Sequence, residues 1–169
     1  MPTTSMNGSR YLLTFIDDCS IYYWIYFLKH KSEVFETFKI FKSSVKNTPW
    51  KNIKAFRLNN GGDYVKREFQ QMCASVGIHM QHSFPYTPQQ HGVAERKKRY
   101  LKEMATCLLE ARNIPPNLWN EEVNCASHIQ NRVPHKSVIG FTPFEALMGH
   151  NPNVSHLSVF AQSMGKNSN

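Results

Sequence analysis

The sequence predicts a single domain of the α/β class, and three observations support this prediction. The chain has 169 residues, which is enough for one hydrophobic core and too short for two comfortable ones. Hydrophobic residues make up 41% of it, a share typical of globular rather than disordered proteins. Strand-like and helix-like stretches alternate at first, and helix-like stretches dominate later, which is an α/β pattern.

The first two elements are predicted to form a β-hairpin. Residues 10–16 are β-branched and aromatic, as in a buried strand. Residues 17–20 have the composition of a turn, and residues 22–28 alternate large apolar side chains as in a returning strand. We interpret the aromatic residues of this second strand as part of the core rather than as a platform for stacking bases.

Two helices and two strands are predicted next. Ser32 is the expected N-cap of a helix that runs to about Lys46, with phenylalanines and valines at helical spacing. Residues 53–58 form the third predicted strand. Residues 69–76 are expected to form a short helix, and residues 78–82 the fourth strand.

The second half of the chain is predicted to be helical after a loop at residues 84–92, where two prolines and a glycine occur. The longest helix is expected from Val93 to about Arg112. Its apolar face is predicted to contain Val93, Tyr100, Met104, Cys107, Leu108 and Ala111. Another helix is expected after Pro115, and a last short helix after Thr142, which has a proline at the first helical position and a capping-box glutamate.

Charge and cysteine content narrow the class of protein. Twenty Lys and Arg against twelve Asp and Glu give a net charge of +8 and a pI near 9.4, which favours a polyanionic partner such as nucleic acid over simple solubility. No apolar run is long enough to cross a bilayer, and the N-terminus has no secretory signal pattern. The four widely spaced cysteines (Cys19, Cys73, Cys107 and Cys125) predict reduced thiols in an intracellular protein.

Several segments together resemble one known family. They are residues 11–18 (Tyr-Leu-Leu-Thr-Phe-Ile-Asp-Asp), residues 60–64 (Asn-Gly-Gly-Asp-Tyr) and residues 85–96, which open with Pro-Tyr-Thr-Pro-Gln-Gln. Asn131-Arg132 and residues 142–145 extend the match. Together they resemble the integrase catalytic core of copia-type retrotransposons, a retroviral-type integrase of the ribonuclease H-like superfamily, over roughly residues 8–160.

The resemblance implies a mixed five-stranded sheet with helices on both faces. It also implies DNA integration by metal-assisted phosphoryl transfer, in which two aspartates and a glutamate hold two Mg²⁺ or Mn²⁺ ions. We expect a flexible N-terminal remnant at residues 1–9, the core-like domain at 10–160 and a disordered tail at 161–169. No small-molecule substrate is expected.

The resemblance assigns the catalytic and metal-binding glutamate to Glu95, and the second aspartate to position 59. The family usually reads Ser-Asp-Asn-Gly-Gly-Glu-Tyr there, whereas residues 58–64 read Leu-Asn-Asn-Gly-Gly-Asp-Tyr. The 35 residues between Asn59 and Glu95 keep the family's spacing, so the register is intact and the carboxylate is lost. Asp63 matches the family's acidic residue after Gly-Gly and does not replace it.

The first aspartate is also expected to be missing. In the family it lies on a central strand that precedes the hairpin, and this chain begins just beyond that point. Asp17 and Asp18 match the family's own pair in the hairpin turn, and we interpret them as turn and capping groups rather than as metal ligands. With Glu95 alone to offset two metal ions, metal binding is expected to be impaired and the domain to be inactive.

A nucleic-acid surface is predicted around the start of the longest helix. It comprises Arg96, Lys97, Lys98, Arg99 and Lys102, with Tyr86, Gln89 and Gln90 in the preceding loop. A solvated basic face or a nuclear-localisation run would give the same cluster, and the latter predicts a nuclear protein, or a cytoplasmic one before import. Three functions remain: an inactive integrase core that binds DNA and pairs as a homodimer, a non-enzymatic module that binds DNA or a partner, and an active transferase that uses Asp17 or Asp18.

Overall fold

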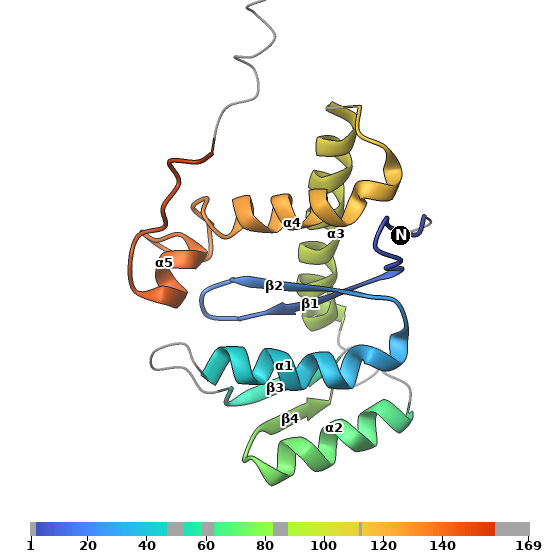
Figure 1. Cartoon of the computed structure of the whole chain (residues 1–169). Coiled ribbons are helices and arrows are strands. Elements are labelled where there is room, and N and C mark those ends of the chain that lie inside the picture. Colours follow the sequence, from blue (N-terminus) through green and yellow to red (C-terminus); the bar gives the residue numbers. More distant parts are fainter. Residues whose placement is uncertain (1–2, 47–52, 59–62, 83–87, 112, 158–169) are drawn as a thin grey trace, which may run out of the picture.

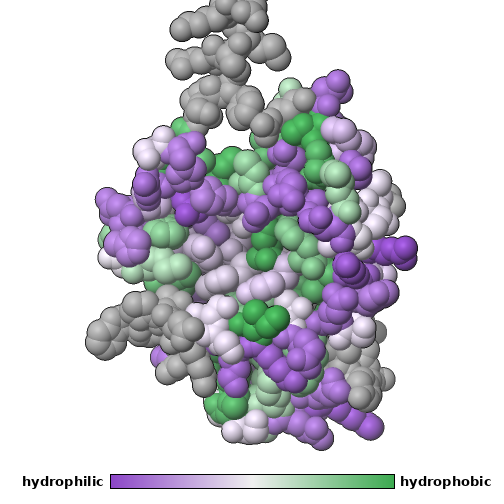
Figure 2. Space-filling model, viewed as in Figure 1, coloured by the Kyte–Doolittle hydropathy of each residue, from purple (hydrophilic) through white to green (hydrophobic). Residues whose placement is uncertain are grey.

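The computed structural model describes residues 3–46, 53–58, 63–82, 88–111 and 113–157 (Figure 1), and Figure 2 shows the same view as a space-filling surface. Within these ranges no helix is long and apolar enough to cross a bilayer. The elements are, in chain order, β1 (Tyr11–Ile16), β2 (Tyr23–Leu28), η1 (Lys31–Glu33), α1 (Val34–Lys46), β3 (Ala55–Leu58), α2 (Asp63–Ser75), β4 (His79–His82), α3 (Pro88–Ala111), η2 (Pro116–Leu118), α4 (Trp119–Gln130) and α5 (Pro143–Met148).

Strands β1 and β2 form the predicted antiparallel hairpin, with Ile16 opposite Tyr23 at the turn. The Asp17 carboxylate fixes this turn, because its Oδ2 accepts from both the N–H and the hydroxyl of Ser20 at 2.7 Å. Ile21 closes the turn with φ of +62°, a left-handed conformation that is unusual for a β-branched residue. Its side chain is nevertheless buried, with 5% exposed.

The hairpin lies between two layers of helices, because its side chains alternate between two faces. Leu13, Phe15, Trp24 and Tyr26 pack into a first core with α1 and α2. Leu12, Ile25 and Phe27 pack into a second core with α3 and α4 (Figure 1). The interpretation of the aromatic strand as core is therefore confirmed.

The first core is built mainly from phenylalanines. Phe38 and Phe69 are completely buried, and Phe15 stacks on Phe41 with ring centroids 4.2 Å apart. Phe56 of β3 stacks on Phe69 of α2 with centroids 5.6 Å apart. Because the contacts link β1, α1, β3 and α2, the lower part of the molecule in Figure 1 shares one core with the hairpin.

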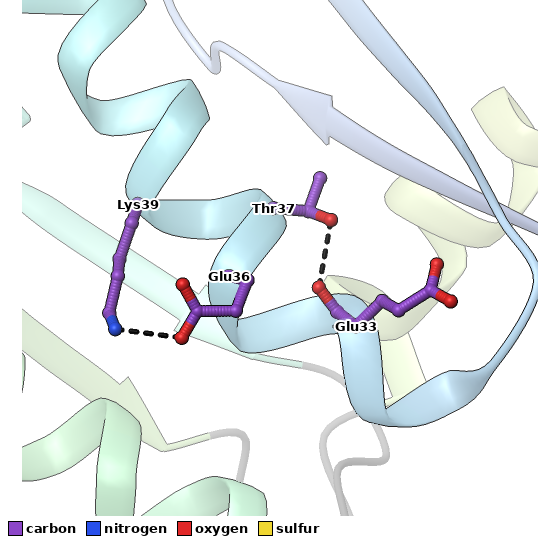
Figure 3. Close-up of polar contacts among 4 residues, drawn as sticks. All are labelled: Glu33, Glu36, Thr37 and Lys39. Atoms are coloured by element: carbon purple, nitrogen blue, oxygen red, sulfur yellow. Dashed lines mark hydrogen bonds and ion pairs between the residues drawn. The ribbon is translucent and has the colours of Figure 1, made fainter.

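Helix α1 is entered through η1, so the prediction of Ser32 as its N-cap was wrong. The Glu33 carboxylate instead accepts from the N–H groups of Lys29 and His30 at 3.1 and 3.2 Å, which satisfies donors that the helix leaves unpaired. In the first turn of α1 the Thr37 hydroxyl donates to the carbonyl of Glu33 at 2.8 Å (Figure 3). A Lys39–Glu36 ion pair at 2.8 Å lies on the exposed side (Figure 3).

Strands β3 and β4 pair in parallel, with Ala55 opposite His79 and Leu58 opposite His82. Helix α2 is longer than predicted, because it begins at Asp63 rather than near Phe69. The described residues form two separate two-stranded sheets, β1–β2 and β3–β4, rather than the single five-stranded sheet that the resemblance implies.

Helix α3 differs from its prediction at its start and in its buried face. It begins at Pro88, so residues 88–92 are helical rather than part of a loop. Leu101 and Ala105 are completely buried against Trp119 and Val123 of α4. Tyr100, expected on the buried face, is 54% exposed, and Cys107 and Ala111 are exposed as well. Met104 and Leu108 pack against the same core as predicted, so the buried face is shifted toward Leu101 and Ala105 but overlaps the predicted one.

Asn131, at the C-terminal end of α4, joins three elements. Its Nδ2 donates to the carbonyl of Tyr23 at 2.9 Å, and its Oδ1 accepts from the N–H of Tyr23 at 2.9 Å. Its backbone carbonyl accepts from the N–H of Phe144 in α5 at 2.8 Å. The side chain is 3% exposed, so these bonds are shielded from water.

Short hydrogen bonds fix the N-terminal segment and the start of helix α5. The carbonyl of Thr3 accepts from Trp119 Nε1 at 3.0 Å, and the N–H of Met6 donates to the carbonyl of Asn117 at 2.9 Å, so this segment is tied to the α4 side of the molecule. Helix α5 has the predicted capping box: the Thr142 hydroxyl accepts from the N–H of Glu145 at 3.2 Å, and the Glu145 carboxylate accepts from the N–H of Thr142 at 2.6 Å.

Candidate metal and nucleic-acid site

The two residues that carry the catalytic prediction are only partly covered by the structure. Glu95 lies in α3, seven residues after Pro88, but its side chain is outside the described part. Asn59 directly follows β3 in the sequence and lies outside the described residues. Strands β3 and β4 are parallel and end at the same edge, and α3 is the next described element. In α/β proteins this edge is where sites form.

The described residues contain no group of three or more His, Cys, Asp or Glu side chains that could hold a metal ion. Asp17 Oδ2 accepts two hydrogen bonds from Ser20, which hold its carboxylate in the hairpin turn. This contact supports the interpretation of Asp17 as a turn residue. Asp18 is exposed in the same turn.

The basic cluster of α3 separates into an outer and an inner set. Arg96, Lys98 and Arg99 are exposed, whereas Lys97 and Lys102 are half-buried. Arg99 pairs with Glu103 at 3.6 Å, but both side chains are more than 60% exposed, at 70% and 63%, so the pair holds Arg99 only weakly. The outer set, together with Tyr100, is open to a ligand in solution.

Lys97 faces the hairpin turn rather than the outer surface. Burial lowers the pKa of its ammonium group, and the carboxylates of Asp18 and then Asp17 act in the opposite direction. Burial and the nearby Lys97 also lower the pKa of His135. Lys97 thus lies among the turn of the hairpin, α3 and the segment after α4, and part of its charge is already compensated.

The loop residues of the prediction are distributed differently from expectation. Tyr86 lies outside the described residues. Gln89 and Gln90 are in the first turn of α3, and their side chains are not described. The inner position of Lys97 was missed, although its spacing of four residues before Leu101 would have placed both on one helix face.

Comparison with known proteins decides the family. The family model described as "Integrase core domain" matches residues 1–88, more than half of the chain. The chain belongs to the integrase core family. It is 38% identical over 160 residues to the retrovirus-related Pol polyprotein from transposon TNT 1-94 of Nicotiana tabacum, which covers 95% of the chain and 12% of that polyprotein. It is 36% identical over 159 residues to the Pol polyprotein from transposon RE2 of Arabidopsis thaliana, covering 94% of the chain and 11% of the relative.

Solved structures confirm the fold of this integrase core. A chain of the simian T-cell lymphotropic virus intasome in complex with PP2A regulatory subunit B56 gamma matches with a TM-score of 0.67 and 19% identity, over 93% of this chain and 54% of that one. The HTLV-2 integrase catalytic core domain in complex with magnesium (trimeric form) matches with a TM-score of 0.60 and 20% identity, over 80% and 83% of the two chains. These likenesses show the ribonuclease H-like α/β fold.

The chain therefore represents an integrase core domain of the kind found in retrotransposon Pol polyproteins, of which it spans only about an eighth in length.

The four cysteines are free thiols: Cys73 is buried, Cys125 is half-buried, and Cys19 and Cys107 are exposed. None of the four forms a disulfide.

Proposed function

We propose that this integrase core domain binds DNA through the outer face of α3 and does not cut or join DNA by itself. The observation that carries the binding proposal is the separation of the basic cluster. Arg96 and Arg99, about one helical turn apart, are exposed on one side of the helix, while Leu101 and Ala105 are buried on the other. Cations on one open face can meet successive phosphates of a nucleic-acid backbone.

Catalytic inactivity is proposed from the chemistry of the donor set. Mg²⁺ and Mn²⁺ prefer anionic oxygen ligands, and an asparagine carbonyl carries no formal charge. The sequence has asparagine at position 59, so one of the three carboxylates of the expected set is replaced by an amide. Asp17 is engaged by Ser20 in the turn. The residues present do not fit a two-metal centre, and the alternative of an active transferase that uses Asp17 or Asp18 has less support.

We also infer that the complete sheet contains a further strand between β1 and β3. The N–H of Asp17 bonds to the carbonyl of Tyr22 at 3.1 Å, and hydrogen-bonded pairs alternate along an antiparallel ladder. The backbone polar groups of Leu12, Thr14 and Ile16 therefore point away from β2. The Thr14 hydroxyl is buried without a hydrogen-bond partner, which favours an additional element at this edge.

Strand β3 has a similar outer edge. The N–H of His79 bonds to the carbonyl of Lys54 at 2.9 Å, so the parallel ladder uses the groups of Phe56 and leaves those of Ala55 and Arg57 pointing away from β4. A strand-forming apolar segment added ahead of Met1 through a flexible linker should raise the midpoint of thermal unfolding. An unchanged midpoint would contradict the inference.

The DNA-binding proposal is tested by the salt dependence of binding to a fluorescent duplex. Each phosphate contact contributes about 0.9 to the slope of log K against log salt concentration. The double variant Arg96→Gln/Arg99→Gln should lose up to about two such contacts and flatten the slope accordingly. Lys97→Gln should change the slope much less, because Lys97 faces Asp17 and Asp18.

A charge-matched control distinguishes DNA binding by the outer face of α3 from general attraction of DNA to the net positive charge of the chain. Lys31→Gln/Lys39→Gln removes the same charge from η1 and α1, on the opposite side of the hairpin from α3. Equal slopes in the two double variants would refute the proposed face and leave only net charge. Metal-dependent nicking of a plasmid that is abolished by Glu95→Gln would refute inactivity, whatever the result of the binding assay.

Nuclear localisation and self-association are two further parts of the proposal. The run of residues 96–99 would serve as a nuclear-localisation signal, which a fluorescently tagged chain tests directly. Self-association as a homodimer is tested by light scattering over a range of protein concentrations. A non-enzymatic partner-binding module is the second candidate function, and a folded chain that does not bind DNA would favour it.

A further inference from the structure

Two histidines from different parts of the chain meet at the surface. His128 is on α4, and His156 is in the irregular segment that follows α5. Their Nε2 atoms are 3.0 Å apart, and the ring planes are inclined at 68° with centroids 5.2 Å apart. The contact joins residues 28 positions apart in sequence, so it is a tertiary contact rather than a local one.

The geometry of the rings indicates a shared proton rather than a metal ion. A centroid separation of 5.2 Å is nearly the nitrogen gap plus the two ring radii, so the nitrogens point at each other. In a metal chelate both nitrogens would turn toward the ion. For the same distance between the nitrogens, the ring centroids would then lie closer together than they do here. A head-on contact needs one N–H donor and one lone pair, so at least one ring must be neutral.

The charged groups around the pair oppose a second proton. Burial lowers the pKa of His128, and Arg132 and His156 lower it further. Arg132 is held in place, since its Nη1 donates to the carbonyl of His128 at 3.2 Å and its guanidinium lies 4.9 Å from the centre of the Phe144 ring. Its positive charge therefore stays beside the pair when pH falls.

The segment that carries His156 is organised by its own contacts. Asn153 Oδ1 accepts from the N–H and the hydroxyl of Ser155 at 3.0 and 2.7 Å. The N–H of Leu157 donates to the carbonyl of Val154 at 2.9 Å. These bonds fold residues 153–157 into a turn, and the contact between the His156 and His128 rings holds this turn on α4.

We propose that His128 and His156 form a proton-controlled clamp, which holds residues 153–157 against α4 while one ring is neutral and releases them when both rings are protonated. A histidine whose pKa is lowered by folding stabilises the closed form fully above its ordinary pKa of about 6.5. This stabilisation is lost as pH falls through the lowered value. The clamp does not depend on DNA binding or on catalytic activity.

Hydrogen exchange of the full chain, followed by mass spectrometry and corrected for intrinsic rates, tests the clamp. Between pH 7.5 and 5, the corrected exchange rate at residues 150–157 should rise. If opening is coupled to one proton, the rate should rise by up to about tenfold for each pH unit below the range in which the pair titrates. His156→Gln should stay protected at pH 5, because glutamine can still bond to either form of His128.

His150→Gln is the matched control and should open like the unmodified chain. Its ring packs on Phe144 with centroids 5.3 Å apart and takes no part in the clamp. Thermal melts at pH 7.5 check that each variant is folded. Protection that does not change with pH in the unmodified chain would overturn the proposal, and so would acid-induced opening that persists in both His128→Gln and His156→Gln.

Discussion

Replacing Asn131 with alanine should loosen the junction between β2 and α4. Both polar atoms of its side-chain amide are used, one by the N–H and one by the carbonyl of Tyr23, at 2.9 Å each. Tyr23 is 5% exposed, so water cannot easily replace the lost partners. The carbonyl of Asn131 that binds Phe144 belongs to the backbone and is kept in the variant.

The size of the effect follows from these two bonds. A net contribution of about 0.5–1.5 kcal/mol per hydrogen bond is a lower bound, because truncation also leaves a buried donor and a buried acceptor unsatisfied, at about 1–3 kcal/mol each. Partial relaxation and water entry reduce the sum, so we expect a loss of about 2–4 kcal/mol. That is a large fraction of the roughly 5–15 kcal/mol by which domains are stable.

Urea unfolding followed by far-ultraviolet circular dichroism measures this loss as a lower midpoint at constant slope. Asn124→Ala is the matched control, since Asn124 is an exposed asparagine on the same helix. Its effect should lie within about 0.5 kcal/mol of zero. A loss for Asn131→Ala that is no larger than that of the control would show that the buried bonds to Tyr23 do not stabilise the fold as reasoned here.

Two further predictions concern the first core and the last helix. Phe38→Ala should destabilise the fold by about 3–5 kcal/mol, because the side chain is completely buried among other rings; thermal melts should show no comparable loss for Ile40→Ala, where the side chain is 59% exposed. In the capping box of α5, hydrogen bonds from the backbone and side chain of Thr142 lower the pKa of Glu145. The stability that this contact adds is present above the ordinary pKa of 4.5 and is lost as pH falls through the lowered value, so unfolding midpoints of Glu145→Gln should fall less between pH 5 and 3 than those of the unmodified chain. An equally steep fall in both proteins would contradict this assignment.

Elements defined by local chemistry could be predicted from the sequence. The hairpin strands were placed within one residue, because side chains that alternate along a strand and a turn rich in Asp and Ser are short-range signals. The capping box at Thr142 is also local, and the structure confirms it with hydrogen bonds in both directions. The family resemblance, carried by contiguous motifs, is confirmed by the integrase core match.

Features set by tertiary packing were harder to predict. The start of α3 was placed five residues late, because Pro88 and Gly92 suggest a loop when taken alone. Proline is in fact favoured in the first turn of a helix, and a glycine costs only about 1 kcal/mol inside a long one. The buried face of α3 was predicted correctly at Met104 and Leu108 but not at Tyr100, because an aromatic residue suggests a core position, whereas the packing of α4 buries Leu101 and Ala105.

The sequence gives a prediction of the candidate site in register but not of its geometry. The spacing between Asn59 and Glu95 predicts which carboxylate is lost, yet it cannot tell which lysines of α3 face outward. That division depends on the hairpin turn, more than 70 residues earlier in the sequence, where Asp17 and Asp18 lie near Lys97. A long-range electrostatic contact of this kind leaves no local pattern.

The left-handed conformation of Ile21 has a consequence for how the turn can change during sequence drift. Holding a β-branched residue at φ of +62° costs about 1–3 kcal/mol, while burying its side chain returns about 1.5–3 kcal/mol. Glycine would remove both contributions, so isoleucine and glycine should be nearly interchangeable in stability at this position. Valine would keep the backbone strain and bury less apolar surface. Evolutionary change at this position should therefore replace isoleucine directly by glycine. Replacement by valine, which is usually the more conservative change, should be rarer.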